Sequence, residues 1–520
     1  MSGKCRKIMY ALVVTVFAAF LWMICCENDR KVSDKAIGET TVQSMRSGEK
    51  TVSLEQSDIP KIEIEDLTDA FTVILQYAPK DMLAGCTVDE SFLMWFYAQY
   101  GRDAVIHIAF DVLDGGNDPD VWYEETGNSI HVLWLLYCRD SGFGQHELEN
   151  VYWMQTAAAS EMVFGFAGDI NFAENWYTTE YMKEQPDGLW DCFSEDLLAQ
   201  MQGVDVMIMN NEFTYVNKKG ATSVYGKAYT FRADPQKAEL LEIFGTDTVT
   251  LANNHVYDYG KRGLLSTLDA LDQEGIPYSG AGRNLKDASK IIYYVMNGRK
   301  VAFVSATQIE RSKQYTKAAT ETEPGVLKAL HPEKFLKIVE EAAQNSDYVI
   351  AEVHWGTEGM LYPDQSQRHL AEQIAQAGAD VIIGGHPHRL QGAAFVGDVP
   401  IAYSLGNFWF STGTLYTTLS KVTITEDGTV KLSFVPCIQQ NLTTRILTEP
   451  EERSDFYEYL ASISADIGID VDGVVYHKSA DDYPAGEILY DSDTSRTDII
   501  GMADNERDAI AIVGNLREDR

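Results

Sequence analysis

The feature that most constrains the fold is a pattern that occurs five times: a short apolar or β-branched run followed at once by polar residues that bind metals or carry protons. The five polar segments are Asp169-Ile170-Asn171, Asn210-Asn211-Glu212, Asn253-Asn254-His255, His354-Trp355-Gly356 and Gly385-His386-Pro387-His388. Helical stretches alternate with these runs, as an α/β fold requires. Because ligands bind at the carboxyl ends of the strands in an α/β sheet, we expect the five segments to converge on one crevice.

The last of these segments carries two histidines two positions apart. Gly384 and Gly385 precede His386 and His388, and a strand that ends in a Gly-rich turn can direct both imidazoles at one point. One such segment alone is better explained as a turn, because Asn and Asp are ordinary turn residues after a strand. Five together favour a metal centre.

The segments supply carboxylate, carboxamide and imidazole groups and no thiolate. This set suits one or two divalent transition-metal ions, Mn, Fe or Zn, better than a structural zinc–thiolate site. We expect Asp169 to bind one ion and Glu212 to bridge two ions that lie roughly 3.5–4 Å apart. The other expected ligands are Asn254, His354, His386 and His388.

His255 is left over by this assignment. A histidine beside a metal ligand can donate a proton to a leaving group or stabilise a transferred phosphoryl group, so His255 is the expected catalytic residue. A hydrogen bond to a ligand is its alternative role. Asp258 is expected to cap the helix after Gly260, with orientation of His255 as the alternative. The residues expected to support the site are Asn171, Asn211, Asn253, Asp258, Glu358 and Asn407.

In order and spacing, these segments resemble the signature of the bacterial CapA capsule-synthesis family. The resemblance covers roughly residues 160–440 and includes Gly378-Ala379-Asp380 and the stretch from Tyr403 to Phe408. It implies a layered α/β sandwich related to calcineurin-like metallophosphoesterases. It also implies a role in poly-γ-glutamate capsule formation, with an anionic polymer such as polyglutamate and membrane capsule-synthase subunits as partners.

Two positions depart from the metallophosphoesterase pattern. That pattern opens with Asp-x-His, where this chain has Asn171, and it has a bridging Asp where this chain has Glu212. An amide oxygen is a weaker ligand than an imidazole, so the sequence supports metal binding better than phosphatase activity. Two functions stay open: a hydrolase that cleaves a phosphoester or an amide of the polymer with His255 as acid, and an assembly factor that holds the polymer without turnover.

Charge and local motifs exclude several other classes. The chain has 42 Lys and Arg against 78 Asp and Glu, a net charge of −36, so no basic surplus is present to bind nucleic acid. The Gly165–Gly168 stretch lacks the Lys-Ser/Thr ending of a phosphate loop. Ser404 lies in no Gly-x-Ser-x-Gly elbow, which excludes a serine hydrolase of that type.

A chain of 520 residues exceeds the usual size of one core, so two folded units with tails are expected. Residues 1–28 are expected to be an uncleaved signal anchor, because basic residues precede an apolar run, Ile8 to Cys26, that spans roughly 28 Å as a helix. A lipoprotein signal or a cleaved signal peptide is the alternative. The charge asymmetry predicts a single-pass membrane protein with its carboxyl-terminal body outside the cytoplasm.

The remaining boundaries follow from composition. Residues 29–60 are polar and lack apolar periodicity, which predicts a linker. Residues 61–156 are rich in aromatic side chains with helical spacing and are expected to be mainly helical, with no assigned role. The CapA-like domain is expected over residues 160–440, and residues 441–520 are expected to be an extension that becomes an acidic tail after about Ile469.

Overall fold

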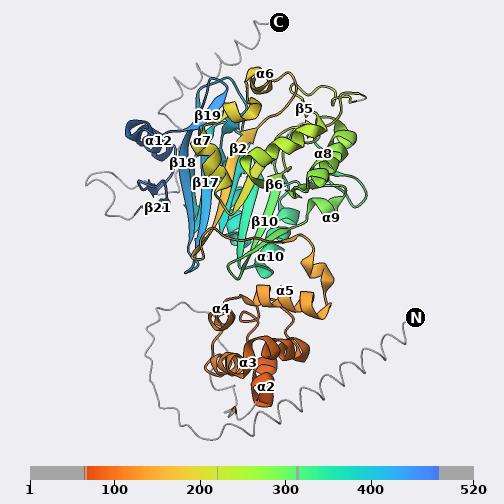
Figure 1. Ribbon diagram of the computed structural model, residues 1–520, viewed down its shortest axis with the longest axis vertical. Coiled ribbons are helices and arrows are strands. Elements are labelled where there is room, and N and C mark those ends of the chain that lie inside the picture. The colour runs from red at the N-terminus through yellow and green to blue at the C-terminus, as the bar shows by residue number, and fades with distance from the viewer. Residues whose placement is uncertain (1–63, 65–66, 220, 312–314, 479–520) are drawn as a thin grey trace. The chain divides into compact units, whose positions relative to one another are not determined.

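The computed structural model describes residues 64, 67–219, 221–311 and 315–478, and all of these residues belong to one compact unit. The expected anchor, linker and acidic tail beyond residue 478 lie outside the described residues. Within those residues, no helix is both long enough and apolar enough to cross a lipid bilayer. A group of helices comes first in the chain, and two sheets with helices on their outer faces follow (Figure 1).

The first sheet has seven strands in the order β1-β9-β10-β12-β13-β15-β14. The central strands β10, β12, β13 and β15 are parallel, whereas β9 and β14 run antiparallel to their neighbours β10 and β15. The strands are β1 (Val151–Trp153), β9 (Ile292–Met296), β10 (Arg299–Thr307), β12 (Tyr348–His354), β13 (Val381–Gly385), β14 (Leu390–Val396) and β15 (Val399–Leu405).

The second sheet has eight strands in the order β19-β18-β17-β2-β3-β6-β7, with β16 paired to β2. β2, β3, β6 and β7 are parallel, and β17, β18 and β19 continue the sheet with antiparallel pairing. The strands are β2 (Glu161–Ile170), β3 (Val206–Asn211), β6 (Thr246–Thr250), β7 (Tyr278–Ser279), β16 (Asn407–Trp409), β17 (Leu415–Thr425), β18 (Val430–Gln440) and β19 (Thr443–Ile446). Three short pairs complete the strands: β4 (Thr214–Tyr215) with β5 (Arg232–Ala233), β8 (Ala281–Gly282) with β11 (Gly325–Val326), and β20 (Ile467–Ile469) with β21 (Val475–His477).

Alternation along the strands shows that the two sheets face each other. Ile208 of β3 and Phe303 of β10 belong to one core between the sheets. Met209, the neighbour of Ile208, packs under α8 on the opposite face of its sheet, and Val304, the neighbour of Phe303, packs under α10. Strands buried on both faces explain why the chain shows continuous apolar runs rather than alternation. The body is a four-layer α/β/β/α arrangement, so the expected α/β class is confirmed.

Helices cover the outer faces of both sheets. α7, α8 and η3 contribute to the core outside the second sheet, and α10 and α11 contribute to the core outside the first. The helices of the body are α6 (Tyr177–Glu184), η2 (Gly188–Cys192), α7 (Glu195–Gln202), η3 (Pro235–Phe244), α8 (Gly260–Glu274), α9 (Leu285–Ala288), α10 (Glu333–Gln344), α11 (Gln365–Gln376) and α12 (Pro450–Ser462).

The α/β body extends beyond both ends of residues 160–440, the range expected for the CapA-like domain. β1 pairs with β9 and β19 pairs with β18, so strands beyond each end of that range belong to the sheets. Phe456 of α12 and Ile467 of β20 are buried in the core between the sheets. The β20–β21 hairpin extends ordered structure to His477, beyond the position near Ile469 where an acidic tail was expected, because Ile467 and Val475 anchor it in that core.

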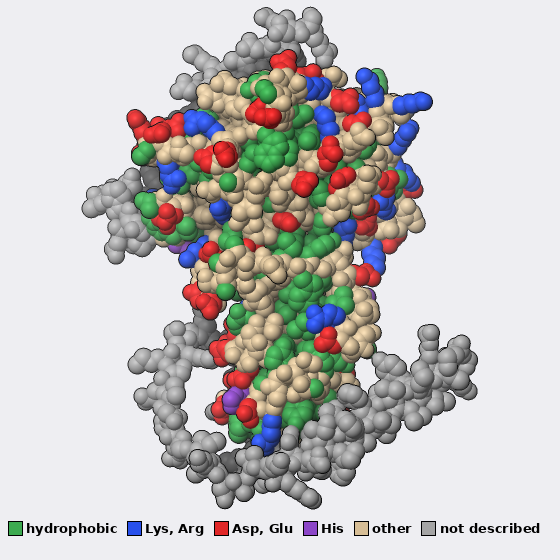
Figure 2. Space-filling model, in the orientation of Figure 1, with side chains coloured by type: hydrophobic (Ala, Val, Ile, Leu, Met, Phe, Trp, Pro, Cys, Tyr) green, Lys and Arg blue, Asp and Glu red, His purple; other side chains and the backbone are tan. Residues whose placement is uncertain are grey.

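Among the described residues, four helices and a short 3-10 helix precede the body. They are α2 (Leu67–Tyr77), α3 (Glu90–Leu113), α4 (Asp120–Thr126), α5 (Ile130–Ser141) and η1 (Gln145–Leu148). Phe92 and Trp122 lie fully buried in their core, with ring centroids 6.0 Å apart. Figure 2 shows hydrophobic side chains on the visible surface of these helices, whereas charged side chains of both signs are dispersed over the α/β body.

Candidate metal centre

The expected site residues lie at the carboxyl ends of strands from both sheets. β2, β3 and β6 are parallel neighbours in the second sheet, and β12 and β13 are parallel neighbours in the first. The second sheet places Asp169, Glu212, Asn254 and His255 at or just after β2, β3 and β6, and the first sheet places His354, His386 and His388 at or just after β12 and β13. The strand-end segments meet in one place, as expected, and the strands that carry them belong to two facing sheets.

Glu212 lies in the middle of the cluster. Its Oε1 is 3.4 Å from Nε2 of His354 and 3.7 Å from Nε2 of His388. Oδ2 of Asp169 is 3.1 Å from Nδ1 of His388, and Oδ1 of Asn254 is 2.8 Å from Nε2 of His354. Asp169 and Glu212 are 1% and 0% exposed, so both carboxylates are removed from bulk water.

Two groups of three side chains have the spacing of metal ligands, and Glu212 belongs to both. One group is Glu212, His386 and His388, and the other is Asp169, Glu212 and His354. Within each group the ligand atoms all lie within 4.8 Å of one another. A carboxylate shared between two such groups has the place of the bridging ligand that the sequence analysis assigned to Glu212.

Three buried polar atoms of the cluster have no hydrogen-bond partner: Oδ2 of Asp169, Oε1 of Glu212 and Nδ1 of His386. Nδ1 of His388 forms an ion pair with Oδ2 of Asp169 at 3.1 Å, while its hydrogen bond goes to Oδ1 of Asn407 at 2.8 Å. Buried polar atoms are nearly always hydrogen-bonded, so three without a hydrogen bond in one cluster require an explanation. Two carboxylate oxygens and an imidazole nitrogen are a suitable donor set for a divalent transition metal. The residues present therefore fit a metal site.

Burial and neighbouring charges perturb the titration of these groups. Burial and the charge of Asp169 raise the pKa of Glu212 well above its ordinary value. Burial lowers the pKa of His354 to about 3 and the pKa of His386 well below its ordinary value. Burial also opposes charge on His388, but Glu212 and Asp169 outweigh it and raise the pKa of His388 to about 10. The two carboxylates therefore favour a positive charge between them, which is the electrostatic condition for binding a cation.

The turn after β13 holds its two histidines in an uncommon backbone conformation. His386 and His388 have φ angles of 97° and 56°, in the left-handed region that non-glycine residues rarely adopt. Gly384 precedes them where a Cβ would lie 2.1 Å from the carbonyl oxygen of Tyr403, so only glycine fits there. Strained backbone of this kind persists where the surrounding structure fixes it, commonly at functional sites.

Asp258 holds the ring of His255 beside the cluster. Its Oδ2 lies 2.8 Å from Nδ1 of His255 and accepts from the backbone N–H of Phe231 at 2.6 Å, and its Oδ1 accepts from Nζ of Lys227 at 2.6 Å. α8 begins after Tyr259 without a side-chain cap, so the preferred role of Asp258 as a helix cap is wrong and the alternative, orientation of His255, is correct. Burial lowers the pKa of His255 and Asp258 opposes that effect. With Nδ1 held by Asp258, Nε2 is the ring nitrogen left to exchange a proton.

Three of the expected support residues lie around the ligands in different ways. Asn407 contacts His388 directly, as described above. Oδ1 of Asn171 accepts from the backbone N–H of Ala173 at 2.8 Å, so this oxygen is already engaged. Glu358 is exposed, and its charge acts on both Glu212 and His388.

Two more expected support residues, Asn253 and Asn211, form hydrogen bonds that order the loop after β6 and the end of β3. Oδ1 of Asn253 accepts from the backbone N–H of His255 at 3.0 Å, and its Nδ2 donates to Oδ1 of Asn210 at 3.0 Å and to the carbonyl of Asn211 at 2.9 Å. Nδ2 of Asn211 donates to the carbonyl of Phe213 at 3.0 Å. These bonds tie the segment that carries His255 to the segment that carries Glu212.

Three residues near the cluster were not assigned from the sequence. Nδ2 of Asn210 donates to Oδ1 of Asp169 at 2.7 Å and lies 3.5 Å from Oε2 of Glu212, so it joins the two carboxylates. Glu352 has an unpaired buried oxygen, and burial raises its pKa to about 8. Glu352 could have been found from the sequence, because it is a charged residue within the apolar run that forms β12. Lys227 carries no signal, because it belongs to a loop with no recognisable pattern.

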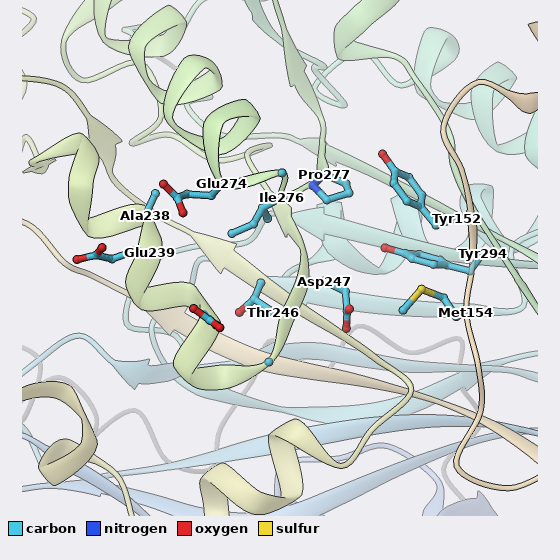
Figure 3. A pocket seen from close by; sticks show the side chains of 13 residues that line it. Tyr152, Met154, Ala238, Glu239, Thr246, Asp247, Glu274, Ile276, Pro277 and Tyr294 are labelled. Carbon is cyan, nitrogen blue, oxygen red and sulfur yellow. The ribbon is translucent and has the colours of Figure 1, made fainter.

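A cavity of 430 Å³ lies at the amino end of β6, away from the metal ligands at its carboxyl end (Figure 3). Figure 3 shows Tyr152 and Tyr294 on one side and Glu274 with Ile276 on the other. Its lining also includes the carboxylates of Glu239, Glu242 and Asp247. A lining with this many acidic side chains disfavours an anionic substrate, and it shares no residue with the two metal-binding groups.

A solved structure with partial similarity is 5′-nucleotidase from Candida albicans SC5314. It is 10% identical, the match covers 60% of this chain and 55% of that chain, and the TM-score is 0.31. A likeness at this level carries no argument about fold or activity.

Sequence comparison identifies the domain that carries the cluster. Residues 163–412 match the model of the family described as bacterial capsule synthesis protein PGA_cap. Capsule biosynthesis protein CapA of Bacillus anthracis is 34% identical over 223 residues, which is 42% of this chain and 53% of that protein. PGA biosynthesis protein CapA of Bacillus subtilis (strain 168) is 34% identical over 214 residues, 40% of this chain and 55% of that protein. The chain thus spans about half the length of these relatives. Residues 163–412 therefore form a domain of the family described as bacterial capsule synthesis protein PGA_cap, to which the two CapA proteins are similar.

Proposed function

We propose that this protein acts in the synthesis of a capsule or another cell-envelope polymer, with poly-γ-glutamate as the polymer implied by its relatives, and that its metal-binding cluster hydrolyses a bond. The observation that carries the proposal is the pair of ligand groups that share Glu212 and contain three unpaired buried atoms. A purely structural cluster would give each of its buried carboxylate oxygens a hydrogen bond, and Oδ2 of Asp169 and Oε1 of Glu212 have none. The layered body with ligands at the strand ends of two facing sheets also supports a metallophosphoesterase-like fold.

The side chains divide into ligands and a proton carrier. The ligands in the proposal are Asp169, Glu212, Asn254, His354, His386 and His388. A bound divalent ion, Mn, Fe or Zn, would supply charge neutralisation and activation of water. His255 would donate a proton to the leaving oxygen or nitrogen through Nε2, while Asp258 holds the opposite side of the ring. The bond cleaved is a phosphoester or an amide of the polymer.

One observation favours a second candidate, a factor that holds the polymer without cleaving it. Asn171 stands where the metallophosphoesterase pattern has a histidine, and its Oδ1 is already bonded to Ala173. A ligand set that lacks this imidazole binds one of the two ions more weakly. Occupancy by one ion would leave a site that holds anionic groups of the polymer without completing a two-metal reaction.

A metal analysis with a substrate screen on the full-length chain tests the proposal. The Mn²⁺-loaded protein should hydrolyse phosphoester or polyglutamyl substrates, and His255→Ala should keep its metal but lose hydrolysis by roughly 10²-fold or more. His369→Ala is the matched control, because His369 is exposed and pairs with Glu372 far from the ligands. A metal-loaded wild type that is inactive on all of these substrates, together with a His255→Ala strain that forms its polymer normally, would establish the holding role instead.

The proposal places the body outside the cytoplasm, anchored by residues 1–28. Its support is the charge asymmetry around the apolar run from Ile8 to Cys26, which lies outside the described residues. Membrane capsule-synthase subunits and the anionic polymer would be its partners, and the net charge of −36 disfavours nucleic acid. Protease added to intact spheroplasts should digest the body, whereas protection until lysis would contradict this placement.

A further inference from the structure

An aromatic surface adjoins the metal-binding cluster. We call it the aromatic shelf and define it as Trp176, Tyr177, Tyr229, Phe231 and Phe410. The ring of Phe231 lies 4.4 Å from the ring of His255, and the ring of Phe410 lies 4.6 Å from the ring of His388. The shelf therefore touches both the proposed proton carrier and a proposed ligand.

Three separate chain segments hold the shelf together. Trp176 precedes α6, Phe231 precedes β5 and Phe410 follows β16. The Trp176 ring lies 4.9 Å from Phe231 and 6.0 Å from Phe410, and its Nε1 donates to the carbonyl of Phe410 at 2.5 Å. The ring of Tyr229 lies 6.5 Å from Phe231 at an interplanar angle of 18°. These contacts fix the rings before any ligand arrives, which lowers the entropy cost of binding.

Exposure increases along the shelf with distance from the ligands. Phe231 and Phe410 are each 5% exposed, whereas Tyr229 is 48% exposed and Tyr177 is 52% exposed. Single exposed aromatic residues need no explanation, but a contiguous set that joins a polar site is typical of ligand binding. The outer rings therefore offer an accessible apolar surface that leads to the metal cluster.

Two cations next to the shelf, Lys227 and Arg232, are already engaged. Lys227 pairs with Asp258 and lies 3.4 Å from Glu310, and Arg232 pairs with Glu174. A stretch of polyglutamate carries one carboxylate per residue and needs free positive charge along its path. Neither of these two cations can supply it, so the shelf matches an uncharged ring better than a row of carboxylates.

We propose that the aromatic shelf binds a ring attached to the anionic group held at the metals, so that the substrate is a phosphoester next to a sugar or nucleobase ring rather than a bare polyglutamate chain. Rings stack on aromatic side chains in a sequence-tolerant way, and Tyr229 presents its ring for such a contact. This inference rests on the proposed hydrolytic site, because it uses the metals to hold the phosphate.

Calorimetry on the Mn²⁺-loaded full-length chain tests whether the aromatic shelf binds a ring, using two non-hydrolysable probes of similar charge. Phenylphosphonate should bind about 5–10-fold more tightly than methylphosphonate, on the scale of an aromatic contact. Tyr229→Ala should remove most of that preference without changing methylphosphonate binding, and Tyr229→Phe should retain it. Trp153→Ala is the matched control, because Trp153 is 46% exposed on β1 in the other sheet.

The possible results separate this inference from the proposed function. If wild type and Tyr229→Ala each bind both probes equally, the aromatic shelf does not bind a ring, but the proposed metal site is not contradicted. Absence of binding by either probe to metal-loaded protein would overturn both. If phenylphosphonate binds more tightly than methylphosphonate, the next step is to displace it with a nucleoside 5′-phosphonate and with a hexose 1-phosphonate. The compound that displaces it more readily shows whether the natural ring is a nucleobase or a sugar.

Discussion

Replacing Glu212 by Gln should have opposite effects on the metal-free and metal-loaded protein. Glu212 is fully buried, its Oε1 has no hydrogen-bond partner, and Asp169 repels its charge. Gln has nearly the same shape and carries no charge, so the variant removes a buried carboxylate whose Oε1 accepts no hydrogen bond, without opening a cavity. We expect Glu212→Gln to stabilise the metal-free protein and to abolish stabilisation by metal, because the shared ligand is lost.

The magnitudes follow from the burial of this group and the size of the ordered body. An unpaired buried polar group costs about 1–3 kcal/mol. An ordered body of roughly 400 residues has an unfolding entropy of about 0.8 kcal/mol per degree, so the variant should melt about 1–4 °C higher without metal. Metal at a hundred times its dissociation constant should stabilise the wild type by about 2.7 kcal/mol, or about 3 °C.

Differential scanning calorimetry in EDTA and in excess Mn²⁺ measures both effects on the same samples. The expected result is a higher melting temperature for Glu212→Gln in EDTA and no Mn²⁺-dependent increase. A variant that melts below the wild type in EDTA would show that Glu212 is satisfied without metal. A variant that keeps the full Mn²⁺ increase would show that Glu212 is not a shared ligand.

Three further predictions test other parts of the structure. The double variant His386→Ala, His388→Ala should lower bound metal to near background by elemental analysis while its circular dichroism stays native-like, because both rings lie on an ordered turn whose strand is held by other contacts. Burial raises the pKa of Asp347 to about 6, so the folded state binds more protons than the unfolded state between about pH 4 and 6, and stability should fall as pH rises through that window by about 2–3 kcal/mol. Urea unfolding across this range should show a smaller fall for Asp347→Asn, and an unchanged slope would contradict the assignment. Lys227→Met should destabilise by about 3 kcal/mol because it leaves the buried Asp258 without its cation, whereas Lys261→Met, which breaks an exposed pair with Glu323, should change stability by less than about 1 kcal/mol.

Local sequence was sufficient to identify the strands and the donor groups at their ends. A buried strand followed by a Gly- and Asn-rich turn is a short-range pattern, so the positions of His354, His386 and Glu212 relative to their strands could be predicted without neighbours. Local side chains also fix the start of η3, because the side chain of Asp234 accepts from the backbone N–H of Gln236 at 3.1 Å and Pro235 follows it.

Local sequence could not decide which strands share a sheet, because hydrophobic periodicity reports that a strand is buried and not which strand lies beside it. The sequence therefore did not say that the centre joins two sheets, nor that Glu212 meets His354, which is far from it in the chain.

The role of Asp258 was decided in the same way. Helix capping and orientation of His255 are both local possibilities, and the partners that settle the choice, Phe231 and Lys227, come from a different loop. The sequence by itself determined the chemical groups and their strands. Only the tertiary structure decided which groups meet, because those contacts depend on how distant segments pack.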